Sequence, residues 1–230
     1  MKTSGRARST RDRPAKPPLS EDAIVDAALA ILSAEGLDAV SMRRVAAALD
    51  TGAGSLYVYV DGRDGLLAAM FDRVIAAVTL ETPDPPRWRA QLHGLLERVR
   101  AQLIAHPGMA AATMVDPPRT DVAMRLLENL LGILLAGGLG AQDAAWAADV
   151  LAAQVTYAAI EAESRRAGPS ALAAEVTATF ARLPAGDFPL ITAHAAQLVA
   201  GDAGERFRFA VDAVIDGVLG RVTPGPGGGR

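Results

Sequence analysis

The sequence predicts an all-α protein, with a tight helix-turn-helix in its first third and a larger group of helices behind it. Half of the 230 residues are hydrophobic and only 4% are aromatic, so the core must consist mainly of Ala, Leu and Val. Alanine-rich segments with few β-branched runs favour helix over sheet. Apolar residues also recur at helical spacing between Gly and Pro breaks.

The first predicted helix follows a basic arm, residues 1–18, which is rich in Arg, Ser and Pro and is expected to be disordered. Ser20 suits the N-cap of this helix, and Glu21 and Asp22 suit its positive end. Gly36 ends it. The buried face is expected to consist of Ile24, Ala27, Ala28, Ile31 and Leu32.

The segment from residue 41 to about 60 predicts two short helices joined by a turn. Ser41 suits the N-cap of the first helix. Its apolar face has i, i+3, i+4, i+7 spacing and consists of Met42, Val45, Ala46 and Leu49. In the turn, Asp50 tolerates a left-handed backbone and Gly52 adopts one freely.

The second helix of this pair is expected to bury Ala53, Leu56 and Val60. The residues left outward are Gly54, Ser55, Tyr57, Val58 and Tyr59. Two short helices with a fixed crossing can present the second helix to a DNA groove.

A longer helix starts at residues 62–64 and stops before Pro83, where we place the domain boundary. We therefore expect one domain at 19–80, a second at 87–222 and a disordered tail at 223–230. The helices expected in the second domain are 88–105, 108–115, 120–136, 141–166, 170–183, 189–199 and 205–222.

The segment from Leu19 to about Phe71 resembles the N-terminal domain of TetR/AcrR-type transcriptional regulators. The resemblance rests on a helix ending in E-G, the S-M-R-R-V-A-A-A-L helix, the G-x-G-S-L-Y turn and helix, and the D-G-L-L start of the next helix. The second half, notably W-R-A-Q-L and FPLITAHAAQLVAGDAGERFRFAVDAVIDGVLGRV, is similar to the C-terminal domain of the tetracycline-repressor subgroup. The resemblance implies that a fourth helix links a DNA-binding domain to a regulatory and dimerisation bundle.

Site residues follow from this resemblance. It implies phosphate contacts from Ser41, Tyr57, Tyr59 and Arg63, and base-edge contacts from Arg43, Gly52, Ala53, Ser55 and Val58. The small Gly54 would allow close approach to the groove, and Arg44 could contact base, phosphate or neither. Arg43 is best suited to a bidentate contact with guanine. The alternatives are that a tyrosine is packing and that Arg43 is a solvated charge.

Two positions depart from the family pattern. Asp50 stands where Gly is usual, and Asp61 stands where Lys is usual, which removes one expected phosphate contact. The basic arm could supply phosphate attraction, because its six cations oppose only Asp12 whereas 20–70 has an acidic excess. The alternative is a tail kept for solubility. The cations of the arm are Lys2, Arg6, Arg8, Arg11, Arg13 and Lys16.

Two helices of the second domain are expected to form the interface of a homodimer. Regulators resembling this one pair such helices with their symmetry mates in a four-helix bundle. The alternative is that both faces pack within one protomer. The small-residue face of 141–166 is Ala145, Ala148, Ala152, Val155 and Ala159, and the apolar face of 205–222 is Phe207, Val211, Val214, Ile215, Val218 and Leu219.

A ligand pocket for an unidentified small-molecule effector is expected in the same domain, although core methionines and interface polar groups would fit the same pattern. The candidate lining is Met109, Met114, Met124, Leu127, Leu131, Trp146, Gln154, Tyr157 and Glu161. Tetracycline repressors use a His to help bind the magnesium ion of the drug. Met114 aligns with that His, so magnesium-tetracycline is not the expected effector.

The expected function is that of a ligand-responsive repressor, released from palindromic double-stranded operator DNA by a small apolar effector. An effector-requiring activator and a helical protein-binding adaptor are the alternatives. The chain has no Cys, three well-separated His and no G-x-S-x-G, so we expect no enzyme, no metal site and no cofactor. The absence of Cys fits a cytoplasmic protein. We expect no membrane span and no signal peptide, because the longest nearly uncharged stretch is too short and the charged N-terminus has no apolar segment behind it.

Overall fold

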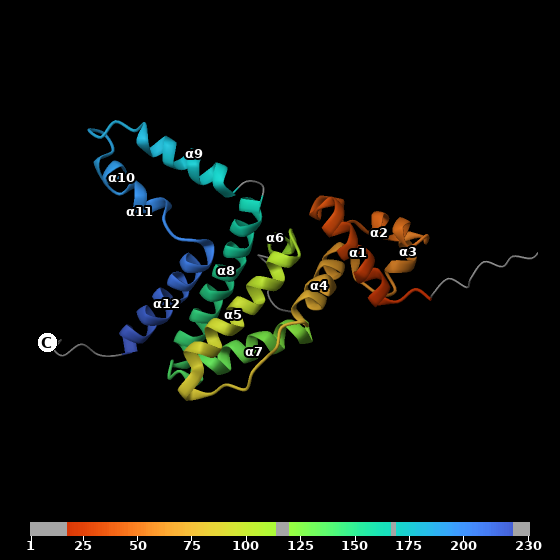
Figure 1. The fold of residues 1–230 in the computed structure, drawn as a ribbon. Helices are drawn as coiled ribbons and strands as arrows, with labels where there is room; N and C mark the ends of the chain where they lie inside the picture. Colours follow the sequence, from red (N-terminus) through yellow and green to blue (C-terminus); the bar gives the residue numbers. More distant parts are fainter. Residues whose placement is uncertain (1–17, 114–119, 167–168, 223–230) are drawn as a thin grey trace, which may run out of the picture.

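The computed structural model describes residues 18–113, 120–166 and 169–222, and every regular element in these ranges is a helix. The N-terminal elements lie together at one end of the molecule and form the head (Figure 1). They are α1 (Glu21–Glu35), the 3-10 turn η1 (Leu37–Ala39), α2 (Met42–Ala48), α3 (Ala53–Leu56) and α4 (Gly62–Ile75). The all-α prediction is confirmed, whereas the basic arm and the C-terminal tail lie outside the described residues.

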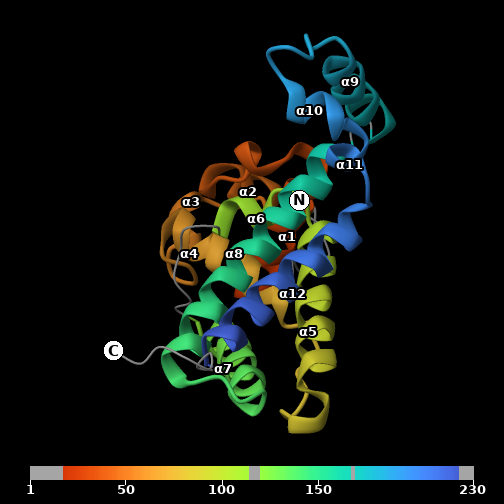
Figure 2. The same ribbon diagram turned by 90° about the vertical axis from the view of Figure 1, so that its left-hand side faces the viewer.

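The rest of the chain forms the body, in which α8 packs against α5, α7 and α12. Figure 2 shows α5, α8 and α12 running side by side. The short helices α9, α10 and α11 lie beyond one end of α8 (Figure 1). The elements of the body are η2 (Pro85–Arg87), α5 (Trp88–Ala105), α6 (Met109–Thr113), α7 (Asp121–Ala136), α8 (Ala141–Arg166), α9 (Pro169–Ala181), α10 (Pro189–Ala193), α11 (Ala195–Val199) and α12 (Ala203–Val222).

The starts of α1 and α2 follow from their capping residues. The Ser20 hydroxyl accepts a hydrogen bond from Ala23 N at 3.2 Å, and the Ser41 hydroxyl accepts one from Arg44 N at 3.3 Å. Each bond satisfies a backbone donor that the first turn of a helix leaves unpaired. Both N-cap predictions are confirmed.

Several predicted helices differ in length from those of the structure, and the helix expected to stop before Pro83 ends at Ile75. The predicted second helix of the helix-turn-helix was too long: α3 ends at Leu56, and the chain turns through residues 57–61. It must reverse there to enter α4, and Gly62 makes the reversal with a φ of +67°. The predicted helix 189–199 is interrupted at His194, which separates α10 from α11.

The faces predicted to meet a second copy are used partly inside the protomer, whereas Ala145 and Ala152 of α8 are exposed. On α8, Ala148, Val155 and Ala159 are buried, and on α12 the buried residues include Phe207 and Ile215. These two helices pack on one another, so the alternative of packing within one protomer holds for these residues. Large apolar side chains remain exposed elsewhere on the two helices, at Trp146, Val150, Tyr157 and Phe209.

Two polar contacts at the junction join segments that are distant in the sequence. The Thr120 hydroxyl, which caps α7, donates to Asp72 Oδ1 on α4 at 2.5 Å. Gly108 N donates to Glu163 Oε2 on α8 at 2.9 Å, and a Cβ at Gly108 would lie 3.2 Å from Leu32 Cδ1. The body therefore holds the head through α4 and through the segment before α6.

No helix in the described part of the chain is long and apolar enough to cross a bilayer.

Candidate nucleic-acid interface

Buried apolar residues fix the orientation of α2 and α3. Val45 and Ala46 on α2, Leu56 on α3 and Val60 after it all belong to the hydrophobic core. The five residues predicted to point outward are exposed, and this prediction is confirmed. Val58 is 81% exposed and Tyr57 is 59% exposed. Exposed apolar and aromatic groups on a rigid helix pair are typical of a surface that contacts a partner.

The turn between the two helices uses the Asp rather than the Gly as its left-handed residue. Asp50 has a φ of +49°, whereas Gly52 has a φ of −80° and caps α3. Thr51 N closes the turn by donating to Ala46 O at 2.9 Å. Asp is one of the few residues other than Gly that adopt this backbone conformation readily. Asp50 therefore still allows the turn, although Gly is usual at this position.

A concave surface of about 1000 Å³ lies between α2, α3 and the start of α4. Residues predicted to contact DNA come together on this surface from both halves of the helix-turn-helix. Its lining includes Ser41, Arg43, Arg44, Ala53, Tyr57 and Arg63.

The two arginines of α2 have different environments. Arg44 Nη2 lies 2.5 Å from Glu35 Oε1, and Arg44 Nε donates to Glu35 Oε2 at 3.4 Å. Arg43 makes no hydrogen bond or ion pair with another residue of the described ranges. Arg43 is therefore available to a base edge, whereas Arg44 is occupied.

Ser41 and Arg63 each keep a donor for a partner. The oxygen of Ser41 accepts from the helix backbone, which leaves its own hydrogen available. Arg63 Nε donates to Val40 O at 3.3 Å, and the guanidinium group has four further N–H donors. Both residues lie beside Arg43 on the concave surface.

The two tyrosines also differ. Tyr57 lines the concave surface, and its hydroxyl has no partner among the residues that the structure describes. The Tyr59 hydroxyl donates to the backbone carbonyl of Leu19 at 2.9 Å. A phenol has a single hydrogen to donate, so Tyr59 cannot keep this bond and also donate to a phosphate.

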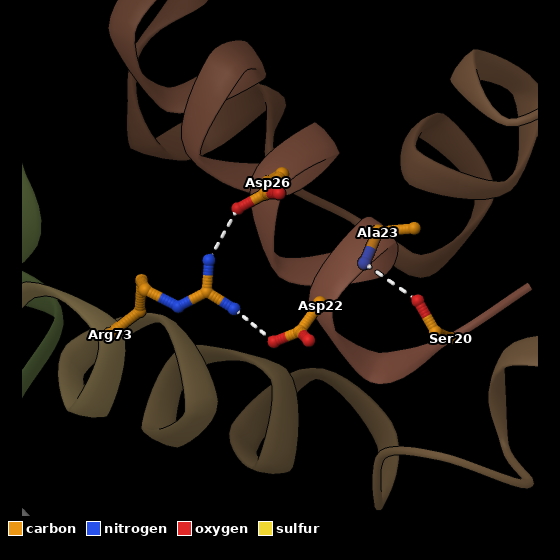
Figure 3. Close-up of polar contacts among 5 residues, drawn as sticks. All are labelled: Ser20, Asp22, Ala23, Asp26 and Arg73. Atoms are coloured by element: carbon orange, nitrogen blue, oxygen red, sulfur yellow. Dashed lines mark hydrogen bonds and ion pairs between the residues drawn. The ribbon is translucent and has the colours of Figure 1, made fainter.

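A third arginine of the head is paired on the α1 side. Figure 3 shows the guanidinium group of Arg73, on α4, between Asp22 and Asp26 of α1. Arg73 Nη1 lies 2.6 Å from Asp26 Oδ1, and Nη2 pairs with Asp22. Arg73 therefore joins α4 to α1 instead of facing the concave surface.

The residues proposed to line a ligand pocket differ widely in exposure. Met109 is fully buried, whereas Met124, Trp146 and Tyr157 are 49%, 57% and 59% exposed on the surface of the protomer. Trp146 and Tyr157 share the outward side of α8 with Val150, because α8 turns its opposite side to the core. Half-buried residues in this set are Leu127, Leu131, Gln154 and Glu161, while Met114 lies outside the described residues.

Across the described ranges, no group of three or more acidic or His side chains is arranged to hold a metal ion. A cavity of about 510 Å³ lies between the head and the body, and its lining includes Leu32, Leu37, Gly108, Ile160 and Glu163. None of the predicted pocket residues that the structure describes lines this cavity.

Two family models match the chain. Residues 24–70 match the model described as bacterial regulatory proteins, tetR family, and residues 82–222 match the tetracyclin repressor-like C-terminal domain. The first match spans α2 and α3, and the second spans the body.

Named relatives agree with these models. An HTH-type transcriptional regulator of Saccharopolyspora erythraea is 34% identical over 182 residues, which are 76% of this chain and 77% of the relative. The HTH-type transcriptional repressor DrrR1 of Streptomyces coeruleorubidus is 39% identical over 127 residues, 54% of this chain and 46% of that protein.

Solved structures of the TetR family protein ActR from Streptomyces coelicolor are also similar. Two of them, in complex with (S)-DNPA and with actinorhodin, are 36% identical to this chain, with TM-scores of 0.81 and 0.82. They are matched over 89% of this chain and over 98% and 97% of their own.

Proposed function

This chain belongs to the TetR family of transcriptional regulators, and we propose that it is a repressor that binds an operator as a homodimer until a small molecule releases it. The family models and the named relatives describe regulators, so the chain is not an enzyme. The repressor role, the operator and the effector are the proposed parts.

The observation that carries the proposal is the exposed face of α2 and α3. Arg43, Tyr57 and Ser41 line one concave surface and keep donors for a partner. Phosphate oxygens accept hydrogen bonds from such donors, and a guanidinium group can read the two acceptors of guanine. A protein-binding adaptor would not need this set of donors on a helix-turn-helix.

The proposed homodimer uses the outward sides of α8 and α12. Trp146, Val150 and Tyr157 on α8 and Phe209 on α12 would cover one another around a two-fold axis. A two-fold axis would place two heads on successive turns of one DNA face, roughly 34–36 Å apart. The operator should therefore be a pseudo-palindrome.

The effector part of the proposal draws on named relatives. ActR has been solved with (S)-DNPA and with actinorhodin, and DrrR1 is named a repressor. We propose that a small apolar molecule enters the body beside Met109, Leu127 and Leu131. It can release the operator only by its differential affinity for the two forms of the dimer.

The test is transcription in vitro from a promoter that carries the bound site. The site is first selected from a random duplex library, so that no operator sequence is assumed. A repressor lowers transcript yield in proportion to occupancy of the site, and scrambling the site abolishes the effect. Higher yield in the presence of the protein would identify an activator instead, and no selected site would overturn the DNA-binding proposal.

A further inference from the structure

We propose that the cavity between the head and the body, the junction cavity, binds a small amphipathic ammonium compound whose charged nitrogen pairs with the carboxylate of Glu163. This site is separate from the body site proposed above, because Met109, Leu127 and Leu131 do not line the junction cavity. A bound cation would also set the position of the head on the body. This regulatory part rests on the proposed function, whereas the binding of the cation does not.

The junction cavity has the size and the apolar walls of a small-molecule site. Its volume of about 510 Å³ lies within the range of roughly 300–1,000 Å³ that is usual for ligand pockets. Among the side chains that line it, Leu32 is buried, and Leu37, Pro107 and Ile160 are half-buried. A ligand with an apolar body would remove these aliphatic groups from water, which favours binding.

The charge of the lining selects a cation. Of the described residues that line the cavity, Glu163 is the only charged one. Its Oε2 accepts a hydrogen bond from Gly108 N at 2.9 Å, whereas Oε1 makes no hydrogen bond or ion pair with a residue that the structure describes. An ammonium group brings both the opposite charge and N–H donors to this oxygen. A carboxylate ligand would instead meet like charge.

The carboxylate of Glu163 is held in place before a ligand arrives. The Gly108 N–H that fixes it belongs to a segment packed closely on the head. A Cβ at Gly108 would lie 3.2 Å from Leu32 Cδ1 and 3.3 Å from Leu37 Cβ, so this backbone has little room to move. A group that is already oriented loses less conformational freedom on binding, which favours affinity.

The junction cavity has walls on both parts of the molecule. Leu37 belongs to η1 of the head, whereas Ile160 and Glu163 belong to α8 of the body. Two residues after η1, Ser41 caps α2 of the proposed DNA-binding face. A shift of the head on the body would change the distance between the walls and hence the affinity for the cation. The cation would therefore favour one head position, and through it change operator affinity.

The first test uses two amines, phenethylamine and tryptamine, with the matched alcohols phenethyl alcohol and tryptophol and the anion hydrocinnamate. Methyl NMR of the full-length chain locates binding, because Leu37 and Ile160 report on the junction cavity, and Leu127 and Leu131 report on the body site. We expect saturable shifts of Leu37 and Ile160 with an amine, and binding of its alcohol weaker by about fivefold or more. No saturable shift with either amine, or equal binding of amine and alcohol, would overturn the proposal. Tighter binding of hydrocinnamate would also overturn it.

The second test removes the charge without removing the hydrogen bond. Glu163→Gln keeps an acceptor for Gly108 N, and it should weaken amine binding by about fivefold or more without affecting the alcohol. Glu128→Gln is the matched control, since Glu128 is exposed on α7 and does not line the cavity. Equal amine affinity of the two variants would overturn the role of Glu163.

A third variant fills the junction cavity. Ala111 lines the cavity and is exposed, so Ala111→Leu reduces the space without disturbing the core. It should abolish the shifts of Leu37 and Ile160 with amine and alcohol alike. Unchanged amine binding by this variant would place the site elsewhere and overturn the proposal. Circular dichroism melting of each variant checks that the protein remains folded.

The regulatory part is tested with DNA. Fluorescence anisotropy gives the dissociation constant for a selected operator with and without a saturating amine. We expect it to change by about threefold or more in the natural chain and to stay constant in Ala111→Leu. No change in the natural chain would overturn the regulatory part. If the natural chain selects no DNA site, the proposed function fails, whereas the methyl shifts still decide whether the cavity binds a cation.

Discussion

The guanidinium group of Arg44 lies 2.5 Å from the carboxylate of Glu35, which joins the start of α2 to the end of α1. The pair lies at the edge of the concave surface that both residues help to line. Glu35 thus neutralises one of the few cations on the proposed DNA-binding face. The pair is substantially exposed, so its contribution to stability is small and its main effect is on charge.

Glu35→Gln should raise affinity for any duplex by a few fold at low salt, because it frees Arg44 for phosphate. The salt dependence of binding should become steeper by about one contact per protomer. Asp38→Asn is the matched control, since it removes one exposed acid of η1 that does not pair with Arg44. Equal gains for the two variants would mean that only net charge matters.

Arg43→Ala should weaken operator binding by roughly 1–3 kcal/mol and relax preference at one base pair. The reason is that Arg43 has no intramolecular partner in the described ranges and lines the concave surface. Binding to a panel of single-base operator variants measures the effect. The same loss of affinity on every sequence, scrambled DNA included, would mean that Arg43 contacts only the DNA backbone.

Asp50→Ala should lower the free energy of unfolding by about 1 kcal/mol relative to Asp50→Gly. Both variants lack the carboxylate, so their difference reports only the left-handed backbone at φ +49°. Urea unfolding at fixed protein concentration gives the comparison. An Ala variant as stable as the Gly variant would mean that the turn does not require this conformation.

Gly108→Ala should destabilise the protein more than Gly138→Ala. The two glycines have nearly equal φ values, +89° and +87°, but a Cβ at Gly108 would meet Leu32 and Leu37 at 3.2 and 3.3 Å. A Cβ at Gly138 would meet nothing within 4 Å. The excess, on the order of 1 kcal/mol, would measure packing between head and body. Equal losses in urea unfolding would assign the whole cost to backbone strain.

Asp72→Asn should stabilise the protein at neutral pH relative to the natural chain. Burial raises the pKa of Asp72; the hydrogen bond from Thr120 opposes this effect and the neighbouring Asp121 adds to it. The folded state therefore holds the proton more tightly, and stability is lost as pH rises from the ordinary value of 3.8 through the raised one. Unfolding free energies of the two chains, measured from pH 4 to 7, should diverge as pH rises. A difference in unfolding free energy that stays constant over this pH range would contradict the raised pKa of Asp72.

Local sequence patterns predicted the helices and the side chains that face outward. Ser20 and Ser41 occupy cap positions defined by their immediate neighbours, and the spacing of Val45, Leu56 and Val60 shows which side is buried. Such features depend on residues within one or two turns. They can therefore be predicted without the tertiary structure.

Pairings between distant residues could not be predicted in this way. Glu35 lies nine residues before Arg44, and Leu19 lies 40 residues before Tyr59, so no helical spacing connects them. Periodicity also shows that α8 has two sides, but not which neighbour covers each. Trp146 and Tyr157 are exposed, although the sequence equally allowed them to line a pocket.

The measurement that tests the central claim most directly is a salt titration of anisotropy for the natural chain and for Arg43→Ala, on selected and scrambled duplexes. The account predicts that the natural chain prefers the selected duplex, that the preference persists as salt weakens total affinity, and that Arg43→Ala reduces it. Equal affinity of the natural chain for both duplexes at every salt concentration would contradict sequence-selective binding by α2 and α3.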